Sequence, residues 1–477
     1  MKHGYRKLVV GLVAVAVLTS TASGAGFSVN GVGARARAMG GAFRAIADDW
    51  SAAYWNPAGL AYVPSTELDV TMLVVNPRPT YTPTVSPNLL GWGFNIKDGG
   101  ARYPEDHLLP FPTFSGFVRL PSAAGVTFGA AIYWTQDVNT IWDLYKTPDN
   151  YNATVNLPKH NYRVDLDVWD FHPTLAKELI KDKLSVGVGV SVQRGDLVFR
   201  RMYPFVNPWP ADYSDPPFDR LLGTMQFDGS GVGIGGNAGL LYKFNDKITL
   251  GLSGQTPVTV KLDGNSDMSI IFPTNRGLQE RDTTYSAYFQ GGSAADRNPF
   301  KMDLELPGSL GLGVAYRPAE RWTLAADVAM TFWSRMEEWK FRFADNPMTF
   351  HVKGIEPIHE FVMPMNWKDQ VQLSLGAQYQ IRENLTLRWG YGFDQSAVPD
   401  ETVSPYFPDY GSRHRLNAGA SLRLSHFELS GQISGAFSGK RTISEISDLN
   451  RDRQFDNFPG EYKTNQFDVL LSTMYRF

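Results

Sequence analysis

The chain has 477 residues with 45 basic and 48 acidic side chains, so it lacks the strong positive charge of a nucleic-acid-binding protein. It contains no cysteine, which excludes a disulfide framework and a thiolate metal site. Glycine, proline and aromatic residues are abundant, although the mean hydropathy is slightly negative. We therefore expect no nucleic-acid partner, and the composition favours a β-rich protein.

The N-terminus carries a predicted secretory signal peptide. Three basic residues precede an eleven-residue apolar run, Leu8 to Leu18, and small residues follow up to Ala25. The run is too short to cross a bilayer as a helix. We expect export, with cleavage after Gly24 or Ala25 and removal of residues 1–25. Because 42 of the 45 basic residues then remain against 48 acidic ones, the mature chain has a net charge of −6.

The stretch that follows the signal peptide, residues 26–65, differs in pattern from the rest of the chain. Asp48 or Asp49 can cap a short helix over 50–54, and the motif Asn-Pro-Ala-Gly at 56–59 ends that helix. A single Asn-Pro-Ala triplet without membrane helices does not make an aquaporin pore. Irregular backbone is tolerated at membrane depth where protein surrounds it. We predict that residues 26–65 form a small, partly helical plug inside a barrel.

From residue 66 onward, apolar residues recur at every second position. In 184–193 and in 385–394, one face of the segment is leucine, valine or aromatic, and the other face is mostly glycine or polar. One face therefore suits lipid and the other suits a polar lumen. Fourteen such runs occur: 66–75, 112–120, 125–136, 162–179, 184–200, 228–244, 248–261, 304–317, 322–334, 366–381, 385–396, 413–425, 427–440 and 463–477.

The connections between these runs alternate in length. Short turns such as 181–183 and 245–247 join strands into hairpins, and long loops join the hairpins. The long loops are 76–111, 137–161, 201–227, 262–303, 335–365, 397–412 and 441–462. Short periplasmic turns and long external loops are typical of outer-membrane barrels. We predict an all-β fold, a 14-stranded antiparallel transmembrane β-barrel over residues 66–477, in the bacterial outer membrane.

We expect charged residues on the strands to face the lumen. A charge that faces lipid at mid-depth costs about 2–4 kcal/mol for Arg or Lys. We therefore predict that these residues face inward and hold the plug, which carries Arg35, Arg37, Arg44, Asp48 and Asp49. The set assigned to the lumen is Asp69, Asp165, Asp167, Asp327, Arg388, Asp394, Arg415, Arg423 and Asp468.

The sequence contains no motif that indicates catalysis. Neither His-Glu-x-x-His nor Gly-x-Ser-x-Gly occurs, so we expect no enzyme, no catalytic residue and no cofactor or metal. The run Gly231–Gly236 continues as a strand, which argues against a dinucleotide loop. The acidic spacing of 448–456 resembles a calcium loop, but Arg453 and Pro459 occupy its glycine and glutamate positions. We interpret that segment as a solvated loop, with a loosely held divalent ion as the alternative.

Two of the long loops, 201–227 and 262–303, are apolar and rich in aromatic residues. External loops are usually polar, so these two suggest either a surface that binds apolar ligands or a lid in which the loops pack on each other. The two interpretations are compatible. The candidate hydrophobic ligand contacts are Phe205, Trp209, Ile270, Ile271 and Phe272.

Several motifs coincide with those of one family. In the plug they are Gly26-Phe-Ser-Val-Asn30, Ala38-Met-Gly-Gly-Ala42, Ala47-Asp-Asp49 and Asn56-Pro-Ala-Gly-Leu60, and in the barrel 306–318, 321–324, 333–334, 366–369, 391–400 and 413–416. Together they resemble the FadL family of outer-membrane transporters for long-chain fatty acids and other hydrophobic compounds. The resemblance spans essentially the whole mature chain and is weakest over 76–300.

The resemblance implies a monomeric barrel that passes hydrophobic molecules without energy input. Ligand would be captured by the loops 201–227 and 262–303 and would then reach a deeper apolar site beside the start of the plug. A kink in the third strand, within 125–136, would open a lateral route into the membrane. The implied plug and gate residues are Gly26, Phe27, Asn56, Pro57, Ala58 and Gly59.

The expected partners are therefore a hydrophobic small molecule and outer-membrane lipid. The substrate class stays open between fatty acids, aromatic hydrocarbons and other apolar compounds, because the resemblance carries over no basic residue that would bind a carboxylate. Some plugged relatives with similar N-terminal motifs serve protein secretion, so an outer-membrane scaffold or shuttle for secretion is the alternative function. The plug argues against an open porin.

Overall fold

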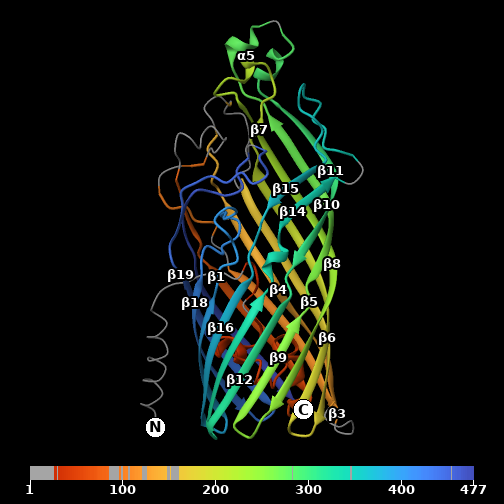
Figure 1. Cartoon of the computed structure of the whole chain (residues 1–477), viewed down its shortest axis with the longest axis vertical. Helices are drawn as coiled ribbons and strands as arrows, with labels where there is room; N and C mark the ends of the chain where they lie inside the picture. The colour runs from red at the N-terminus through yellow and green to blue at the C-terminus, as the bar shows by residue number, and fades with distance from the viewer. Residues whose placement is uncertain are drawn as a thin grey trace.

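The structure is a computed structural model that describes residues 26–29, 31–84, 96–97, 100–105, 108–120, 126–147, 151, 161–281, 283–343, 346–452 and 454–477. The predicted signal peptide lies outside the described residues. Figure 1 shows a tall antiparallel barrel with short turns and the C-terminus at its lower end, and with α5 at its upper tip. No helix among the described residues is long and apolar enough to cross a membrane.

The wall of the barrel is one closed antiparallel sheet. The first strand, β1 (Glu67–Pro77), pairs on one side with β3 (Leu109–Leu120) and on the other with the last strand, β22 (Asn465–Arg476). The other sheet elements are β4 (Val126–Trp142), β5 (Tyr162–Ile180), β6 (Leu184–Met202), β7 (Phe205–Val206), β8 (Arg220–Lys243), β9 (Ile248–Gln255), β10 (Val258–Ile271), β11 (Ser293–Leu306), β12 (Ser309–Ala319), β13 (Trp322–Thr331), β14 (Glu338–Phe343), β15 (Glu360–Pro364), β16 (Gln370–Arg382), β17 (Leu385–Asp394), β18 (Arg413–Leu424) and β19 (Phe427–Ser438).

Four crossings of the wall are interrupted, so that each counts as two elements: β9 with β10, β11 with β12, β13 with β14, and β15 with β16. Since β7 is a two-residue addition, the nineteen elements of the sheet make fourteen crossings. The predicted 14-stranded barrel is therefore confirmed. A second, three-stranded sheet joins β2 (Thr80–Pro83), β20 (Arg441–Ile443) and β21 (Gly460–Lys463) in the loops.

The two faces of the wall exchange polarity part-way up the strands. In the lower part of β5, Phe171 is exposed on the outer face while His172 is buried inside. In the upper part, Leu166 is buried inside while Asp165 and Asp167 lie on the outer face. An apolar outer face suits lipid, and a charged one suits water. The lower band is therefore the membrane-spanning part, and the wall continues above it.

The assignment of Asp165 and Asp167 to the lumen was therefore wrong. These two carboxylates lie above the lipid band, where a half-buried charge on the outer face can meet water and costs less than a charge that faces lipid. Of the other assigned residues, Arg423 lies at the exposed lower rim, with its guanidinium 3.6 Å from the carboxylate of Glu428. The remaining six are buried inside the barrel: Asp69, Asp327, Arg388, Asp394, Arg415 and Asp468.

The upward extension of the strands also shortens two loops relative to the prediction. The connection between β6 and β8 spans 203–219, and the connection between β10 and β11 spans 272–292. Ile270 and Ile271, predicted as loop residues, belong to the end of β10. The lipid-facing alternation that marks a barrel strand ends at the membrane surface, so the sequence pattern did not reveal the rest of these strands.

The region above the lipid band encloses a large apolar cluster, which we call the upper core. It contains Phe27 of the plug, inward residues of the upper strands such as Val164 and Phe227, and loop residues such as Trp209 and Tyr406. Short loop helices accompany it: α5 (Ala211–Ser214), α6 (Arg276–Gln279), η2 (Ser286–Phe289) and η3 (Trp333–Arg335). The upper core closes the extracellular end of the barrel with packed side chains.

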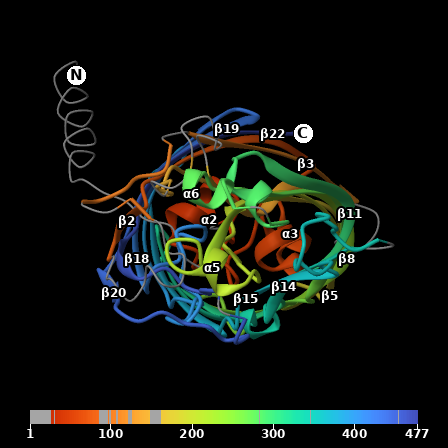
Figure 2. The same ribbon diagram turned by 90° about the horizontal axis from the view of Figure 1, so that it is seen from above.

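The N-terminal segment lies inside the ring of strands. Its helices are α2 (Ala34–Ala38), α3 (Ala52–Trp55) and the 3₁₀ helix η1 (Pro57–Tyr62), which Figure 2 shows within the barrel when it is viewed along its axis. The predicted helix over 50–54 is thus α3, shifted by one or two residues. The alanine side chains of these plug helices are almost fully buried. Because alanine is small, the segment fits inside the narrow lumen.

Candidate functional site

The wall holds the plug helix α3 by its C-terminal carbonyls. The last carbonyls of a helix have no partner within the helix. Three strand side chains supply the missing donors: Asn237 Nδ2 to Ala53 O at 2.6 Å, Gln255 Nε2 to Tyr54 O at 3.2 Å, and Ser253 Oγ to Trp55 O at 2.7 Å. The polar face of β8 and β9 therefore matches one helix end of the plug.

The Asn-Pro-Ala-Gly motif continues the same attachment. Asn56 Nδ2 donates to Arg44 O at 2.8 Å within the plug and to Leu240 O at 3.1 Å in the wall. Its Oδ1 accepts from Ala58 N at 3.2 Å and so caps η1. A Cβ on Gly59 would lie 1.8 Å from Ala47 O, so only glycine fits there. The motif thus joins two turns of the plug to each other and to the barrel.

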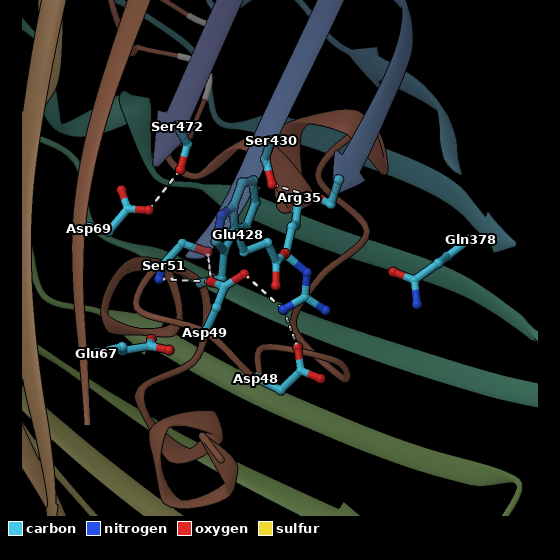
Figure 3. Close-up of polar contacts among 12 residues, drawn as sticks. Arg35, Asp48, Asp49, Ser51, Glu67, Asp69, Gln378, Glu428, Ser430 and Ser472 are labelled. Carbon is cyan, nitrogen blue, oxygen red and sulfur yellow. Dashed lines mark hydrogen bonds and ion pairs between the residues drawn. The ribbon is translucent and has the colours of Figure 1, made fainter. Parts of the chain in front are cut away.

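Ion pairs add a second set of links. Arg37 Nη2 lies 2.6 Å from Asp468, and Arg44 Nη1 lies 3.3 Å from Asp327, so both plug arginines pair with carboxylates of the wall. Arg35 instead pairs within the plug, with Asp48 at 2.8 Å and Asp49 at 3.0 Å, as Figure 3 shows. These charges are mostly buried, so removal of one partner would leave the other unpaired at high cost.

The start of the plug is held at the base of the upper core. Gly26 N donates to Asp409 Oδ2 at 3.0 Å, and Ala397 N donates to the same oxygen at 2.9 Å. Burial raises the pKa of Asp409, while these two hydrogen bonds oppose the shift. Gly26 has a φ of 59°, and a Cβ there would lie 2.5 Å from the ring of Trp333, which explains the need for glycine.

Phe27 occupies a box of aromatic rings beside that contact. Its ring centroid lies 5.0 Å from that of Trp333, 5.4 Å from Trp367, 6.1 Å from Phe407 and 6.5 Å from Trp339. The rings come from η3, β14, the short break between β15 and β16, and the loop between β17 and β18. The apolar surroundings of Gly26 and Phe27, predicted as a deep ligand site, are thus filled by the plug itself.

The third strand carries an irregularity at the point where the plug touches it. The pairing of β4 with β5 shifts register between Trp134 and Gln136, which marks a β-bulge within the range where a kink was expected. Val29 N donates to Thr135 O at 3.0 Å, and Phe27 O accepts from Asp137 N at 2.8 Å. The start of the plug therefore pairs with the bulge.

The wall is unpaired directly beside this bulge. The ladder between β3 and β4 ends at Phe114 and Ile132, and the residues of β3 above it pair only with β1. A cavity of about 50 Å³ lies at this gap next to Gly26 and Phe27. Its wall residues include Val75, Leu109, Phe111 and Val138. A mostly apolar cavity, which Arg37, Asp137 and Arg413 also line, thus lies beside the start of the plug.

A second cavity, of about 100 Å³, lies between the plug and the inner face of the wall, and we call it the polar chamber. Side chains that line it include Gln136, Asp170, His172, Gln255 and Gln372. Each of these residues belongs to the wall and points inward. The polar chamber suits water and polar groups, in contrast to the apolar gap beside β4.

The predicted ligand contacts lie within the closed lid. Phe205, Trp209, Ile270, Ile271 and Phe272 are all buried in the upper core, with exposed fractions of 7% or less. The indole ring of Trp209 stacks on Tyr288 at 4.7 Å, and its Nε1 donates to Lys353 O at 2.8 Å. The structure therefore brings the five residues into one cluster, packed against other loop side chains.

Sequence reasoning missed one residue of this cluster, Arg201. It is the penultimate residue of β6 and is only 5% exposed, yet no carboxylate among the described residues forms an ion pair with it. Its guanidinium lies 5.5 to 5.9 Å from the rings of Tyr203, Phe361 and Phe455. Its Nη2 has no hydrogen-bond partner in the described part of the chain. The alternation of side chains along β6 could have identified it, because Arg201 shares the inward face with Leu197 and Phe199.

A family model described as outer membrane protein transport protein (OMPP1/FadL/TodX) matches residues 15–470. The chain belongs to this family. The predicted FadL-family membership and outer-membrane location are thereby confirmed. The family is one of transport proteins, which agrees with the expectation that the chain is not an enzyme.

Individual relatives of the FadL family are distant. The long-chain fatty acid transport protein of Salmonella typhi is 27% identical over 198 residues, which cover 42% of this chain and 41% of that protein. The 47 kDa outer membrane protein of Pasteurella multocida is 25% identical over 209 residues, or 44% of each chain. The aligned part of this chain therefore spans less than half the length of these relatives.

Solved structures of the FadL family share the fold over nearly the whole chain. A FadL homologue from Pseudomonas aeruginosa superposes with a TM-score of 0.73 at 19% identity, covering 95% of this chain and 100% of its own. The toluene transporter TodX from Pseudomonas putida gives a TM-score of 0.68 at 19% identity, covering 94% and 99%. At these identities the likeness establishes the barrel with its N-terminal plug.

Proposed function

We propose that the protein transports hydrophobic small molecules passively across the outer membrane as a monomer, and that its preferred substrates are long-chain carboxylates. The observation that carries the substrate class is Arg201. A buried guanidinium with an unpaired N–H, in an otherwise apolar core, offers a charge-assisted hydrogen bond to a carboxylate. A monoaromatic hydrocarbon has no group that would use it.

The surroundings of Arg201 fit an acyl chain. The upper core extends from the loop residues around Trp209 to the ring box around Phe27, and it is apolar along that length. A carboxylate bound at Arg201 would leave its hydrocarbon tail among these side chains, where burial contributes roughly 0.8 kcal/mol for each CH₂ group. The tail displaces packed rings, so binding is coupled to movement of the lid or of Phe27.

In the next step of the proposed route, the solute moves laterally through the wall of the barrel. Beyond Phe27 a solute meets either the polar chamber or the gap beside β4, and only the gap is lined by Val75, Phe111 and Val138. A hydrocarbon tail gains free energy in the apolar gap and loses it in the polar chamber. We therefore propose exit through the wall into the membrane, with lipid as the partner that receives the solute.

Residues 26–65 act as the gate in this proposal. The contact of Gly26 with Asp409 and the box around Phe27 close the route from above, while the hydrogen bonds of Asn56 keep the rest of the plug in place. A ligand that enters the box competes directly with Phe27. Displacement of residues 26–29 would also release β4 at its bulge, which links ligand entry to the gap.

Uptake by whole cells tests the proposal. Cells that lack the native protein are given radiolabelled oleate or toluene, with and without expression of this chain. Expression should raise the initial rate of oleate uptake, and it should raise that of toluene less. Equal rates with and without the protein for both solutes would overturn the transport proposal. Faster uptake of toluene alone would overturn the substrate class.

A further inference from the structure

The polar chamber contains a hydrogen-bonded chain that connects a wall histidine to the plug. His172 on β5 has one ring nitrogen, Nδ1, 3.0 Å from Asp170 Oδ2 and the other, Nε2, 3.1 Å from Asn237 Oδ1. Asn237 in turn donates through Nδ2 to Ala53 O of α3 at 2.6 Å. Asp170 Oδ2 also accepts from Ser191 Oγ at 2.7 Å. Each of these side chains is buried.

The orientation of the Asn237 amide is fixed by the plug. Because Ala53 O is an acceptor, the NH₂ group of Asn237 must face the plug, and its oxygen must face His172. A rotated amide would set its oxygen against the carbonyl of Ala53 and would lose the bond that holds α3. His172 Nε2 must therefore carry a proton that it donates to Asn237.

A second proton is required on the other side of the ring. Asp170 Oδ2 and His172 Nδ1 are at hydrogen-bonding distance, so one proton lies between them. It is held either by the ring, as an imidazolium beside a carboxylate, or by the acid, beside a neutral ring. Both forms contain one proton more than a carboxylate with a neutral imidazole.

We propose that this additional proton on the Asp170–His172 pair keeps Asn237 attached to Ala53, which makes His172 a positioning residue for the plug. When the pair loses the proton, the remaining one stays between the ring and the carboxylate, and Nε2 presents a lone pair to Asn237 Oδ1. That contact is repulsive. The amide then rotates or withdraws, and α3 loses one of its three wall bonds.

The geometry around the pair supports a specific role. A Cβ on Gly189 would lie 2.3 Å from His172 Nε2 and 2.5 Å from Asn237 Oδ1, so glycine leaves the room that this contact needs. Tyr133 on β4 packs its ring 5.8 Å from that of His172. The other titratable or charged groups that line the polar chamber are Tyr54 and Arg44 of the plug, Asp327 and Arg415. The inference concerns the plug and does not depend on which solute is carried.

Hydrogen exchange on the purified full-length protein tests the inference. The amides of Tyr54, Trp55 and Asn56 are bonded within α3 and report its local opening. Their protection factors, corrected for the intrinsic effect of pH, should fall about tenfold between pH 5 and pH 10, as expected for one lost hydrogen bond and a repulsive contact. Amides of β5 and β8 in the same sample serve as the internal reference.

Three variants make the test specific. In Asp170→Asn the new amide donates to Nδ1 of a neutral ring, so Nε2–H still binds Asn237, and protection should stay high and independent of pH. His172→Gln has no group that titrates in this range and should also give a flat profile, which serves if the first variant folds poorly. His414→Gln changes a histidine bonded to Tyr391 at 2.7 Å and should keep the wild-type profile.

The result that overturns the proposal is a flat profile in the wild-type protein. An unchanged pH-dependent profile in Asp170→Asn or in His172→Gln would overturn it as well, because the effect would then arise elsewhere. Since the readout is protection of α3 and not uptake, failure here leaves the transport proposal intact, and failure of transport leaves this inference intact.

Discussion

Replacement of Arg201 with methionine should weaken oleate binding without weakening the binding of its neutral counterpart, oleyl alcohol. Methionine keeps an unbranched apolar side chain of similar reach and removes only the charged group. A hydrogen bond to a charged group contributes about 1.5–3 kcal/mol, so the Kd for oleate should rise by roughly 10- to 150-fold. The alcohol has no carboxylate, so its Kd should change less than about threefold.

The same variant should not lose stability. Arg201 is buried with no ion pair among the described residues, and its charge is offset only by three aromatic rings, the Met202 carbonyl at 3.4 Å from Nε and the more distant carboxylate of Asp456. Each such ring contributes on the order of 0.5–2 kcal/mol, which is less than the usual penalty for an isolated buried charge. The apparent unfolding temperature of Arg201→Met should therefore equal or exceed that of the wild type.

Binding is measured by titration calorimetry on the purified protein in detergent, with oleate and oleyl alcohol in parallel. Arg200→Met is the matched control, because Arg200 is the next residue of β6 and carries the same charge. Its Nε donates to Gln226 Oε1 at 2.8 Å on the outer face. Equal losses of oleate and alcohol affinity in Arg201→Met, or an equal loss of oleate affinity in Arg200→Met, would refute a carboxylate site at Arg201.

Three further outcomes follow from the described contacts. Val138→Lys should abolish oleate uptake by placing a charge in the apolar gap, whereas Ala329→Lys, at a similarly buried residue of the polar chamber outside the upper core, should leave the rate within about twofold. Asn56→Asp cannot donate to its two carbonyl partners and should lower the local stability of the plug by about 2–4 kcal/mol, seen as faster hydrogen exchange in η1 with a barrel that stays heat-modifiable. Burial raises the pKa of Asp456 to about 6. The folded loop 444–459 therefore binds this proton more tightly than the unfolded loop, and its exchange protection should be greatest below about pH 4 and fall as the pH rises past 6. Asp456→Asn should remove that fall.

The membrane-spanning part of the fold was predictable from the sequence. Alternation in segments such as 184–193 and 385–394 is a local pattern, and each strand carries it independently, so fourteen crossings and their short turns could be counted without tertiary contacts. The plug was predictable for the opposite reason. Residues 26–65 break the alternation, and the Asn-Pro-Ala-Gly motif restricts the backbone so strongly that a compact turn is its main option.

The site was predictable only in part, because it is made by contacts between distant segments. Arg201 stands beside Arg200 in the sequence, and nothing local separates the inward arginine from the outward one except the register of β6. The donors that hold α3 are ordinary serine, asparagine and glutamine residues on β8 and β9. Their role depends on which carbonyl of the plug they face, and no sequence pattern records that.

The wrong placement of Asp165 and Asp167 has the same physical cause as the proposed route of the solute, namely that charges avoid lipid. A charge on the outer face is unfavourable below the membrane surface, where it meets lipid, and is tolerated above it, where it meets water. Along β5 the inward side chains change from apolar at Leu166 and Val168 to polar at Asp170 and His172, at the level where the outer face changes from charged to apolar. Along β5 the wall is therefore apolar outside and polar inside within the lipid band, and charged outside and apolar inside above it. On the proposed route, a hydrophobic solute that descends through the upper core would meet this boundary beside Phe27, where the interior ceases to be apolar. The gap between β3 and β4 lies at that same level, so the inversion of the wall would direct the solute outward into the lipid.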